Sequence, residues 1–250
     1  MNKPMISIIT VVYNGKCHIE KTILSVNSQT YKNYEYIIID GNSSDNTTEI
    51  LRKHNEKITY WISEKDAGIY DAMNKGIKIA KGEWLLFMNC GDTFVNETTL
   101  ASIMNSNIRN NIKFIYGDYL QKNGTDKYIR HTTSFEKGIL NHQSVIYKKE
   151  LHHEHGMYIV TPKIIVSDYL FFLRIPAKEV LKIDLPIAIY DDNGISNHGN
   201  WSIIGKYSAD LVFRRITLLQ FISCYIKLKI KSIIPSSLKD KLKANYNGKI

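Results

Sequence analysis

Short apolar runs alternate with segments of helical periodicity along the first hundred residues. Four apolar runs predict strands at residues 6–12, 34–39, 58–62 and 84–88. The second and fourth runs are too continuously apolar for a strand with one face in water, which indicates a buried sheet. Between residues 69 and 80, apolar side chains recur three and four positions apart, and Gly82 follows where a helix would end. This alternation predicts an α/β fold with a Rossmann-like, mostly parallel central sheet flanked by helices.

The second half of the chain continues the pattern less regularly. Further strands are predicted at residues 114–119, 143–147 and 181–190. One helix is predicted to begin at Asn46, with Glu49 three residues on, and another to follow Asp168. A chain of 250 residues with 44% hydrophobic composition can bury one substantial core, so we expect one domain with an appendage.

The net charge of +9 is concentrated at the C-terminal end. Residues 203–250 carry ten Lys and Arg against two Asp, which leaves +8, whereas the first 202 residues carry 23 basic and 22 acidic groups. The uncharged stretch at residues 216–226 is shorter than the roughly 20 apolar residues that span a bilayer. Two interpretations stay open: a basic amphipathic segment lying on an anionic membrane surface, or a C-terminal helix packed on the domain with a solvated basic face.

Cysteine and histidine usage bears on metal binding and on the redox compartment. Cys17, Cys90 and Cys224 have neither CxxC spacing nor an even count, which argues against a disulfide framework and a zinc site. A reducing cytoplasm fits this pattern, and the N-terminal apolar run is too short for a signal peptide. The run HHEH at residues 152–155 has the composition of a metal cluster, but solvent exposure is the favoured interpretation.

Polar residues follow each of the first four predicted strands. They are Tyr13-Asn14-Gly15, residues 40–45, Glu64-Lys65-Asp66 and residues 89–92. Ligands bind beyond the carboxyl ends of parallel strands, although polar residues there also form ordinary turns. Neither GxGxxG nor GxxxxGKS/T occurs, so no glycine cradle holds a phosphate. A cluster of carboxylates can hold a diphosphate only through a divalent cation.

Three segments carry a resemblance to a known family. They are SIITVVYNG, IIIDGNSSDNT and DAGIYDAMNKGIKIAKGEWLLFMNCGD. Over roughly residues 4–197, the chain resembles the inverting family 2 glycosyltransferases with the glycosyltransferase-A fold. The resemblance is strongest to the bacterial branch that builds O-antigen and other surface polysaccharides. It implies a hexosyltransferase with a nucleotide-sugar donor, expected to be a UDP-sugar, a bound Mg²⁺ or Mn²⁺, and a single displacement at the anomeric carbon.

The resemblance also implies a division of the chain and an acceptor. Residues 1–202 are expected to form the catalytic domain, with a nucleotide-sugar half up to about residue 119 and an acceptor half from residue 120. Residues 203–250 are the basic C-terminal segment. The implied acceptor is a polyprenyl-diphosphate-linked saccharide, which favours a peripheral location on the cytoplasmic face of the inner membrane.

Site residues are carried over from the resemblance position by position. Asn89 and Gly91 replace the two carboxylates of the family's Asp-x-Asp motif, so Asp92 is the expected metal ligand, and a plain turn is the alternative. Asp168 resembles the family's general base, with helix capping as the alternative. Nucleotide-sugar binding is expected of nine residues: Thr10, Tyr13, Asn14, Asp40, Asp66, Asn74, Asn89, His142 and Gln143. A structural role is the alternative for His142.

Two departures from the family pattern bear on the donor. The family often has two consecutive carboxylates after the second strand, whereas this chain has Asp40-Gly41, which leaves the identity of the nucleobase open. The family's frequent Ala-Arg-Asn reads Ala72-Met73-Asn74, so a cationic partner for the diphosphate is missing at that place. Lys65 or Lys75 could replace it.

Two other classes of protein share parts of this pattern. A sugar-phosphate nucleotidyltransferase would need an early glycine-rich, basic phosphate loop, and YNGKCHIEK at residues 13–21 is a poor one. A nucleic-acid-binding module would account for the basic tail but leaves the acidic strand ends unexplained. We therefore expect no nucleic-acid partner.

Overall fold

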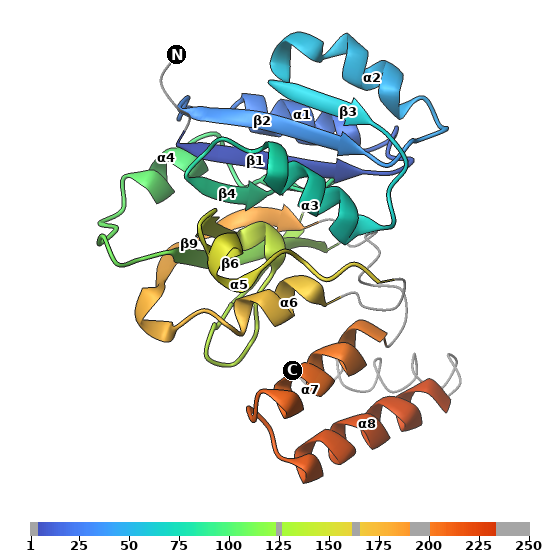
Figure 1. The fold of residues 1–250 in the computed structure, drawn as a ribbon, viewed down its shortest axis with the longest axis vertical. Coiled ribbons are helices and arrows are strands. Elements are labelled where there is room, and N and C mark those ends of the chain that lie inside the picture. The colour runs from blue at the N-terminus through green and yellow to red at the C-terminus, as the bar shows by residue number, and fades with distance from the viewer. Residues whose placement is uncertain (1–4, 124–126, 162–165, 191–200, 234–250) are drawn as a thin grey trace. The chain divides into compact units, whose positions relative to one another are not determined.

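The computed structural model describes residues 5–123, 127–161, 166–190 and 201–233 of the chain. The chain divides into two compact units, Met1–Gly194 and Ile195–Ile250. The first unit contains the sheet drawn in Figure 1 and the helices that cover it, and the described part of the second contains two helices.

Nine described strands of the first unit form one sheet. They are β1 Ile6–Val12, β2 Tyr34–Asp40, β3 Tyr60–Ser63, β4 Trp84–Phe87, β5 Thr93–Phe94, β6 Phe114–Asn123, β7 Lys127–His131, β8 Val145–Lys148 and β9 Val180–Tyr190. The strand order is β3-β2-β1-β4-β8-β6-β9-β5, and β7 pairs with β6. The first four strands are parallel, β8 runs antiparallel between β4 and β6, and β9 is parallel to β6. The carboxyl ends of β1 to β4 therefore meet at one edge, as predicted.

Helices cover both faces of this sheet. In the first unit they are α1 Ile19–Asn27, α2 Thr47–Lys53, α3 Ile69–Ile79, α4 Thr99–Met104, α5 Leu151–His155 and α6 Ser167–Phe172. Neighbouring residues of β1 point to opposite faces: Ile8 joins the core with α1, α2 and α4, and Ile9 joins the core with α3, α5 and α6. Burial on both faces explains the continuous apolar runs, and the predicted α/β fold is confirmed.

Two predicted strands begin later in the structure, and one predicted helix start lacks a side-chain cap. β3 begins at Tyr60, two residues later than expected. β8 begins at Val145 because His142–Ser144 form a 3-10 turn, η2, in which Asn141 caps the backbone. α2 begins directly after Asn46, whose left-handed φ of 68° places it in the turn without a side-chain capping bond. Two more 3-10 turns are η1 Asn55–Lys57 and η3 Ala177–Glu179.

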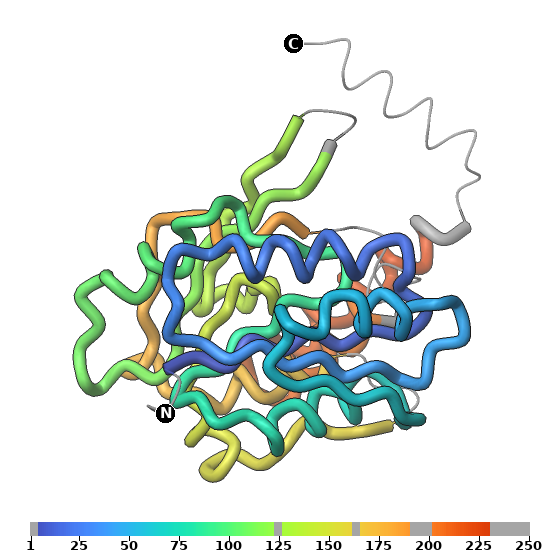
Figure 2. Tube along the Cα trace, turned by 90° about the horizontal axis from the view of Figure 1, so that it is seen from above, coloured from blue at the N-terminus to red at the C-terminus, as the bar shows by residue number. Residues whose placement is uncertain are grey.

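β6 and β7 form a hairpin that stands out from the rest of the first unit in Figure 2. Its base is fixed by Asp118, a buried carboxylate that accepts hydrogen bonds from Arg130 Nε at 2.8 Å and Thr133 N at 3.0 Å. Burial alone raises the pKa of Asp118, but the bonds from Thr133 and Arg130 outweigh it and hold that pKa below its usual value. The hairpin is therefore anchored by a charged group that stays ionised.

The run HHEH is not uniformly exposed, and the expectation of solvent exposure is wrong for His152. These residues belong to α5. Neighbouring residues of a helix point in different directions, so His152 faces the core while His153 stays exposed. The His152 ring stacks on Phe171 at a centroid distance of 4.4 Å, and its Nε2 lies 3.0 Å from the Tyr147 hydroxyl. Burial lowers the pKa of His152 to about 4, so the ring is neutral and structural.

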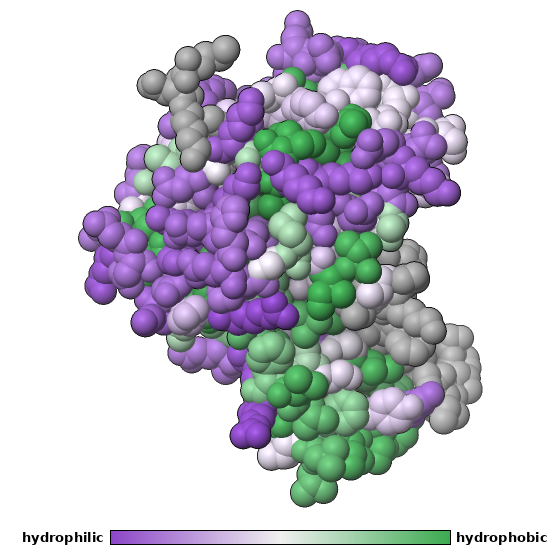
Figure 3. Space-filling view, in the orientation of Figure 1, coloured by the Kyte–Doolittle hydropathy of each residue, from purple (hydrophilic) through white to green (hydrophobic). Residues whose placement is uncertain are grey.

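The described residues of the second unit form two helices, α7 Trp201–Val212 and α8 Leu218–Ile233. In Figure 3, hydrophobic surface covers much of both helices. Asp210, buried in α7, pairs with Lys206 Nζ at 2.9 Å and with Arg215 Nε at 3.5 Å. Across the described residues, the helices are too short or too polar to span a membrane.

Candidate functional site

The loops after β1 and β2 are bonded to each other at the carboxyl edge of the sheet. Asn14 N donates to Ser43 Oγ at 2.7 Å, and Ser44 N donates to Asn14 Oδ1 at 2.9 Å. Asp40, fully buried at the end of β2, accepts from Ser43 N at 2.9 Å and from Ser63 Oγ at 2.6 Å. Asp40 thus connects the loops after β2 and β3 and stabilises the floor of the site.

Gly41, the residue after Asp40, lies beside the carboxylate of Asp66 and the ring of Tyr13. A Cβ added to Gly41 would lie 2.5 Å from Asp66 Oδ2 and 3.4 Å from a ring carbon of Tyr13. The Tyr13 side chain is 68% exposed, so its ring is free to stack on a ligand. Asp66 therefore occupies the space that a side chain at position 41 would fill. These groups suit a planar heterocycle with hydrogen-bonding edges.

Asp92 is held in place at the end of the β4 loop. It is 3% exposed, and Gln143 Nε2 donates to its Oδ2 at 2.7 Å. Thr22 Oγ1 donates to the Asp92 carbonyl at 2.9 Å and accepts from Gly91 N at 2.9 Å. Gly91 has a φ of 99°, a conformation that favours glycine. The loop is therefore built around Asp92 rather than being a solvated turn.

The oxygen atoms of this loop fit a hard divalent cation. Asn89 Oδ1 is buried and has no hydrogen-bond partner among the described residues, and it belongs to the same turn as the Asp92 carboxylate. Mg²⁺ and Mn²⁺ prefer such oxygen ligands. Within the described part of the chain, no group of three His, Cys, Asp or Glu residues could hold a metal ion. Asn89 and Asp92 would thus supply part of a coordination shell, and a ligand's phosphates and water the rest.

Asp168 lies in the first turn of α6 with its side chain 23% exposed. Tyr70 OH donates to its Oδ1 at 2.7 Å, and His142 Nδ1 lies 3.0 Å from its Oδ2. Burial by itself raises the pKa of Asp168, but the bonds from His142 and Tyr70 outweigh it and hold that pKa below its usual value. Val166, not Asp168, is the N-cap residue of α6. Asp168 is therefore an ionised carboxylate and a candidate to accept a proton from a neighbouring ligand.

The turn η2 brings the two carboxylates into one site. Its consecutive residues His142 and Gln143 bond to Asp168 and Asp92, which come from distant parts of the chain. A candidate cation ligand and a candidate proton acceptor are thus bonded to neighbouring residues of η2, an arrangement that suits group transfer from a diphosphate.

Comparison with known proteins assigns this site to a family. The model of "Glycosyl transferase family 2" matches residues 7–170, which include Asp92, η2 and Asp168. The chain belongs to glycosyl transferase family 2. An uncharacterized glycosyltransferase of Haemophilus influenzae is 29% identical over 185 residues, which cover 69% of this chain and 72% of that protein. A PGL/p-HBAD biosynthesis glycosyltransferase of Mycobacterium bovis is 27% identical over 209 residues, or 79% and 81% of the two chains.

Solved structures share the fold of this family 2 glycosyltransferase. S. aureus TarS 1-349 in complex with UDP-GlcNAc matches with a TM-score of 0.68 and 18% identity, over 83% of this chain and 65% of that one. The mannosyltransferase PcManGT from Pyrobaculum calidifontis, in complex with GDP-Man and Mn²⁺, matches with a TM-score of 0.67 and 15% identity, over 87% and 66%. The chain therefore spans about two thirds of each of these structures.

Two residues expected to bind the donor have structural partners in the glycosyltransferase. Asn74 Nδ2 donates to the Tyr158 carbonyl at 2.9 Å, and Tyr158 N donates to Asn74 Oδ1 at 3.0 Å. Thr10 is fully buried and donates to the Met88 carbonyl at 2.6 Å. Their polar groups already bond to the protein, and a role of Thr10 or Asn74 toward the donor stays a prediction, as it does for the rest of the nine.

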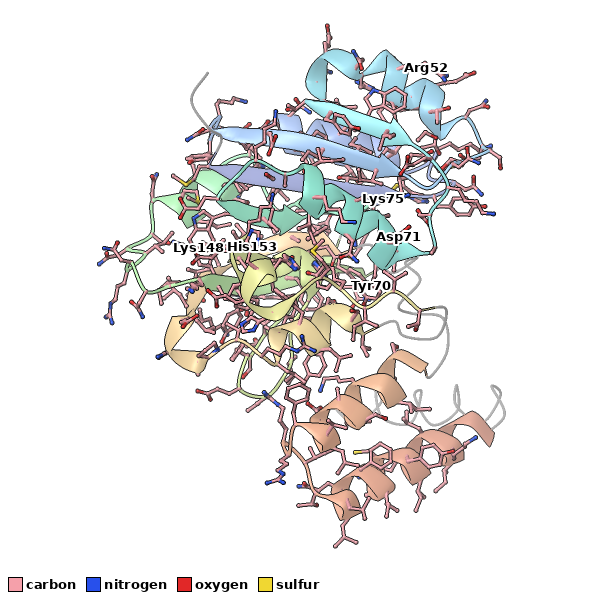
Figure 4. The ribbon with its side chains drawn as sticks, in the orientation of Figure 1. Arg52, Tyr70, Asp71, Lys75, Lys148 and His153 are labelled. Atoms are coloured by element: carbon pink, nitrogen blue, oxygen red, sulfur yellow. The ribbon has the colours of Figure 1, made fainter. Side chains whose placement is uncertain are left out.

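The lysines considered as diphosphate partners are Lys65, in the loop before α3, and Lys75, within α3. Lys75 projects from α3 near Tyr70 and Asp71 in Figure 4. Its Nζ pairs with Glu64 at 2.8 Å and donates to the Lys65 carbonyl at 2.9 Å. Burial tends to lower the pKa of Lys75, but the bond from Glu64 raises it above its usual value. Lys75 is thus a permanent cation that Glu64 already neutralises, which makes it a poor replacement for the missing arginine.

Tyr70 is a site residue that the sequence pattern did not reveal. It lies on the buried face of α3, between Ile69 and Ala72, so its spacing is that of an ordinary core residue. The one available signal was its hydroxyl, because a buried tyrosine OH needs a partner. In the structure that partner is Asp168.

A cavity of about 1080 Å³ lies at the opposite end of the parallel strands, lined by the start of β2, the residues just before β4, the end of β8 and His153 of α5. Lys148, labelled in Figure 4, pairs there with Glu83 at 2.9 Å. Glu35 accepts from Ser7 Oγ at 2.6 Å. Because these charges are satisfied within the protein, we assign no part of the transferase site to this cavity.

Proposed function

We propose that this glycosyltransferase moves a hexosyl group from a nucleoside-diphosphate sugar, expected to be a UDP-sugar, to a hydroxyl of a lipid-linked saccharide, with inversion at the anomeric carbon. The observation that carries the proposal is the joining of Asp92 and Asp168 by η2. A panel of nucleotide sugars, incubated with Mn²⁺ and monitored for slow donor hydrolysis, tests the donor class. Hydrolysis of a nucleotide sugar that stops on chelation supports the proposal, and no turnover of any nucleotide sugar contradicts it.

The donor end is assigned to the loops after β1, β2 and β3. Tyr13 would stack on the base, and Asp66, beside Gly41, would accept from its hydrogen-bond donors. Asn14 and Asp40 would hold these loops in place. Solved neighbours of the same fold bind UDP-GlcNAc and GDP-Man, which supports a nucleotide-sugar donor without deciding the base.

Substituting Gly41 by alanine is expected to weaken donor affinity by about ten-fold, the loss of one good hydrogen bond. The new Cβ would lie 2.5 Å from Asp66 Oδ2, so the carboxylate must move. Calorimetric titration with the nucleoside diphosphate measures the effect. In an Asp66→Ala background the same substitution should add little. Equal losses in both backgrounds would mean that Asp66 is not the affected group.

The diphosphate end is assigned to Asp92 and Asn89, through Mg²⁺ or Mn²⁺. When bound, the cation neutralises charge on the departing nucleoside diphosphate. Gln143 keeps the Asp92 carboxylate in a fixed orientation, because it donates to Oδ2 at 2.7 Å. A solved neighbour of the same fold holds Mn²⁺ together with GDP-Man.

The acceptor end is assigned to Asp168. Its carboxylate would take the proton of the acceptor hydroxyl while that oxygen bonds to the anomeric carbon and the bond to the nucleoside diphosphate breaks. Its low pKa keeps it ionised at neutral pH. One base and one displacement lead to inversion.

The second unit is assigned to an anionic membrane surface on the cytoplasmic side, where a polyprenyl-diphosphate-linked acceptor would lie. Asp210 is neutralised inside the unit, and α8 contains no Asp or Glu. Leu218, Leu219, Ile222, Ile226 and Ile230 of α8 are exposed. Exposed apolar side chains beside a net excess of Lys and Arg suit the interface of an anionic bilayer. The relative named for PGL/p-HBAD biosynthesis supports a surface glycan product, with O-antigen as one example.

Substituting Leu219 and Ile226 by glutamate is expected to lower binding to phosphatidylglycerol vesicles by at least about ten-fold. Leu219 is 79% exposed, so the fold should tolerate the change. Co-sedimentation measures binding, and Leu24→Glu, an exposed site on α1, is the matched control. If the double variant binds vesicles as the parent does, the alternative is favoured, in which the C-terminal segment has a structural role and its basic face is solvated.

A further inference from the structure

We propose that Tyr70 and His142 are positioning residues that hold the Asp168 carboxylate by both of its oxygens, and that η2 fixes this base relative to Asp92. The proposal rests on the proposed function, in which Asp168 is the general base. It gives Tyr70 and His142 a role on the acceptor side. His142, which was expected to bind the donor, is assigned instead to orienting the base.

The Asp168 carboxylate is bonded to side chains from two different elements. Tyr70 on α3 donates to Oδ1 at 2.7 Å, and His142 on η2 lies with Nδ1 3.0 Å from Oδ2. Both side chains are more than nine-tenths buried. Two bonds from separate directions fix the plane of the carboxylate, so its remaining lone pairs have one orientation toward the acceptor.

The His142 ring is enclosed by aromatic side chains. Phe87 meets it edge-on at a centroid distance of 4.9 Å, Phe172 lies at 5.6 Å and Tyr158 at 5.9 Å. His142 Nε2 is buried and has no hydrogen-bond partner among the described residues. A phenylalanine would pack between these aromatic rings without burying an unpaired nitrogen. The bond from Nδ1 to Asp168 is therefore what a histidine adds at this position.

The Tyr70 hydroxyl can act only as a donor to Asp168. Burial raises the pKa of Tyr70 far above its usual value, and the neighbouring Asp168 charge raises it further. The other titratable groups of this cluster are Tyr147 and Tyr158, which bond to each other at 2.6 Å, and His152, whose Nε2 lies 3.0 Å from the Tyr147 hydroxyl. The two tyrosines too stay protonated, because burial raises the pKa of each. No described basic group except His142 bonds to Asp168.

The same turn connects the base to the cation site. Gln143, the residue after His142, donates to Asp92 Oδ2 at 2.7 Å. One peptide unit thus separates the residue that orients the base from the residue that orients the metal-binding carboxylate. A fixed spacing between these two groups is what a concerted displacement needs, since bond making and bond breaking occur on opposite sides of one carbon.

The test compares Tyr70→Phe and His142→Phe with Tyr147→Phe. Each of the first two should lower kcat by about 10- to 100-fold, as the loss of an orienting partner does, with the donor KM unchanged. Tyr147→Phe removes a buried hydroxyl from the same cluster without touching Asp168, and it should keep parental kcat. His142→Asn, whose Nδ2 can replace the ring Nδ1, should recover part of the turnover that His142→Phe loses. Tyr70→Phe deletes a single oxygen, so the test stands even if His142→Phe fails to fold.

A second readout does not depend on catalysis. The Asp168 carboxyl pKa can be followed by carbon-detected NMR, with Asp168→Asn identifying the resonance. It should rise in Tyr70→Phe and in His142→Phe, because both lose a bond to the ionised form. If both variants keep parental kcat and an unmoved Asp168 pKa while Asp168→Asn is inactive, the positioning role of Tyr70 and His142 is wrong and the base assignment stands. Turnover by Asp168→Asn would instead overturn the proposed base.

Discussion

Replacing Asp168 by asparagine is expected to lower turnover by roughly 10²- to 10⁴-fold, the usual effect of losing a general base. The amide has nearly the same shape but cannot take the acceptor proton. Donor affinity should stay near the parental value, because Asp92 and the loops assigned to the nucleotide are untouched. Initial rates with acceptor, together with calorimetric titration of donor, measure the two quantities separately.

The matched control for this substitution is Asp184→Asn. The Asp184 side chain is 97% exposed and bonds to Arg130 at the base of the β6–β7 hairpin. The Asp184→Asn substitution makes the same exchange of a carboxylate for an amide, but away from the site, so turnover should stay near parental. If Asp168→Asn also turned over at a near-parental rate, the assignment of the base would be wrong.

Replacing Asp92 by asparagine is expected to remove most activity, by at least about a hundred-fold, since losses of 10- to 100-fold already follow when a ligand's supporting partner is removed. The loop has Asn89 and Gly91 at the positions where the family carries carboxylates, so no second carboxylate of the loop can compensate. The asparagine oxygen can still accept from Gln143, which should preserve the fold. Activity titrated against Mn²⁺ and thermal unfolding measure the two effects.

Chelation provides the counterpart of this experiment. The parental enzyme should lose turnover in excess chelator and regain it with added Mn²⁺ or Mg²⁺, while Asp92→Asn should respond weakly to either. Full parental activity in excess chelator would show that Asp92 does not act through a cation.

Most of the N-terminal half of the fold was predictable because burial of its strands and helices leaves a pattern in the local sequence. β1, β2 and β4 are covered on both faces, and a strand without a solvent face has no polar positions to interrupt its apolar run. The periodicity of α3 was equally clear, since one of its faces packs on the sheet. Parallel strands then place Asp40, Asp66 and Asp92 at one edge, which the sequence order alone implies.

The C-terminal half was less predictable because its strand pairings and side-chain contacts join residues that are far apart in the sequence. β5 has two residues, too few for a periodic signal, and β8 inserts antiparallel between β4 and β6, a pairing that no local pattern encodes. His152 looked solvated because it stands in a charged run, yet α5 turns it toward Phe171. Tyr70 looked like core because its helix position is apolar, and only the fold brings Asp168 to its hydroxyl.

The configuration of the new glycosidic bond tests the account most directly. One carboxylate base and one displacement predict that an α-linked nucleotide sugar gives a β-linked product. NMR of the purified product reads the anomeric configuration from the coupling of its anomeric proton. A β-linkage from an α-linked donor is the result we predict, and an α-linkage would contradict the role given to Asp168 and the single displacement with it.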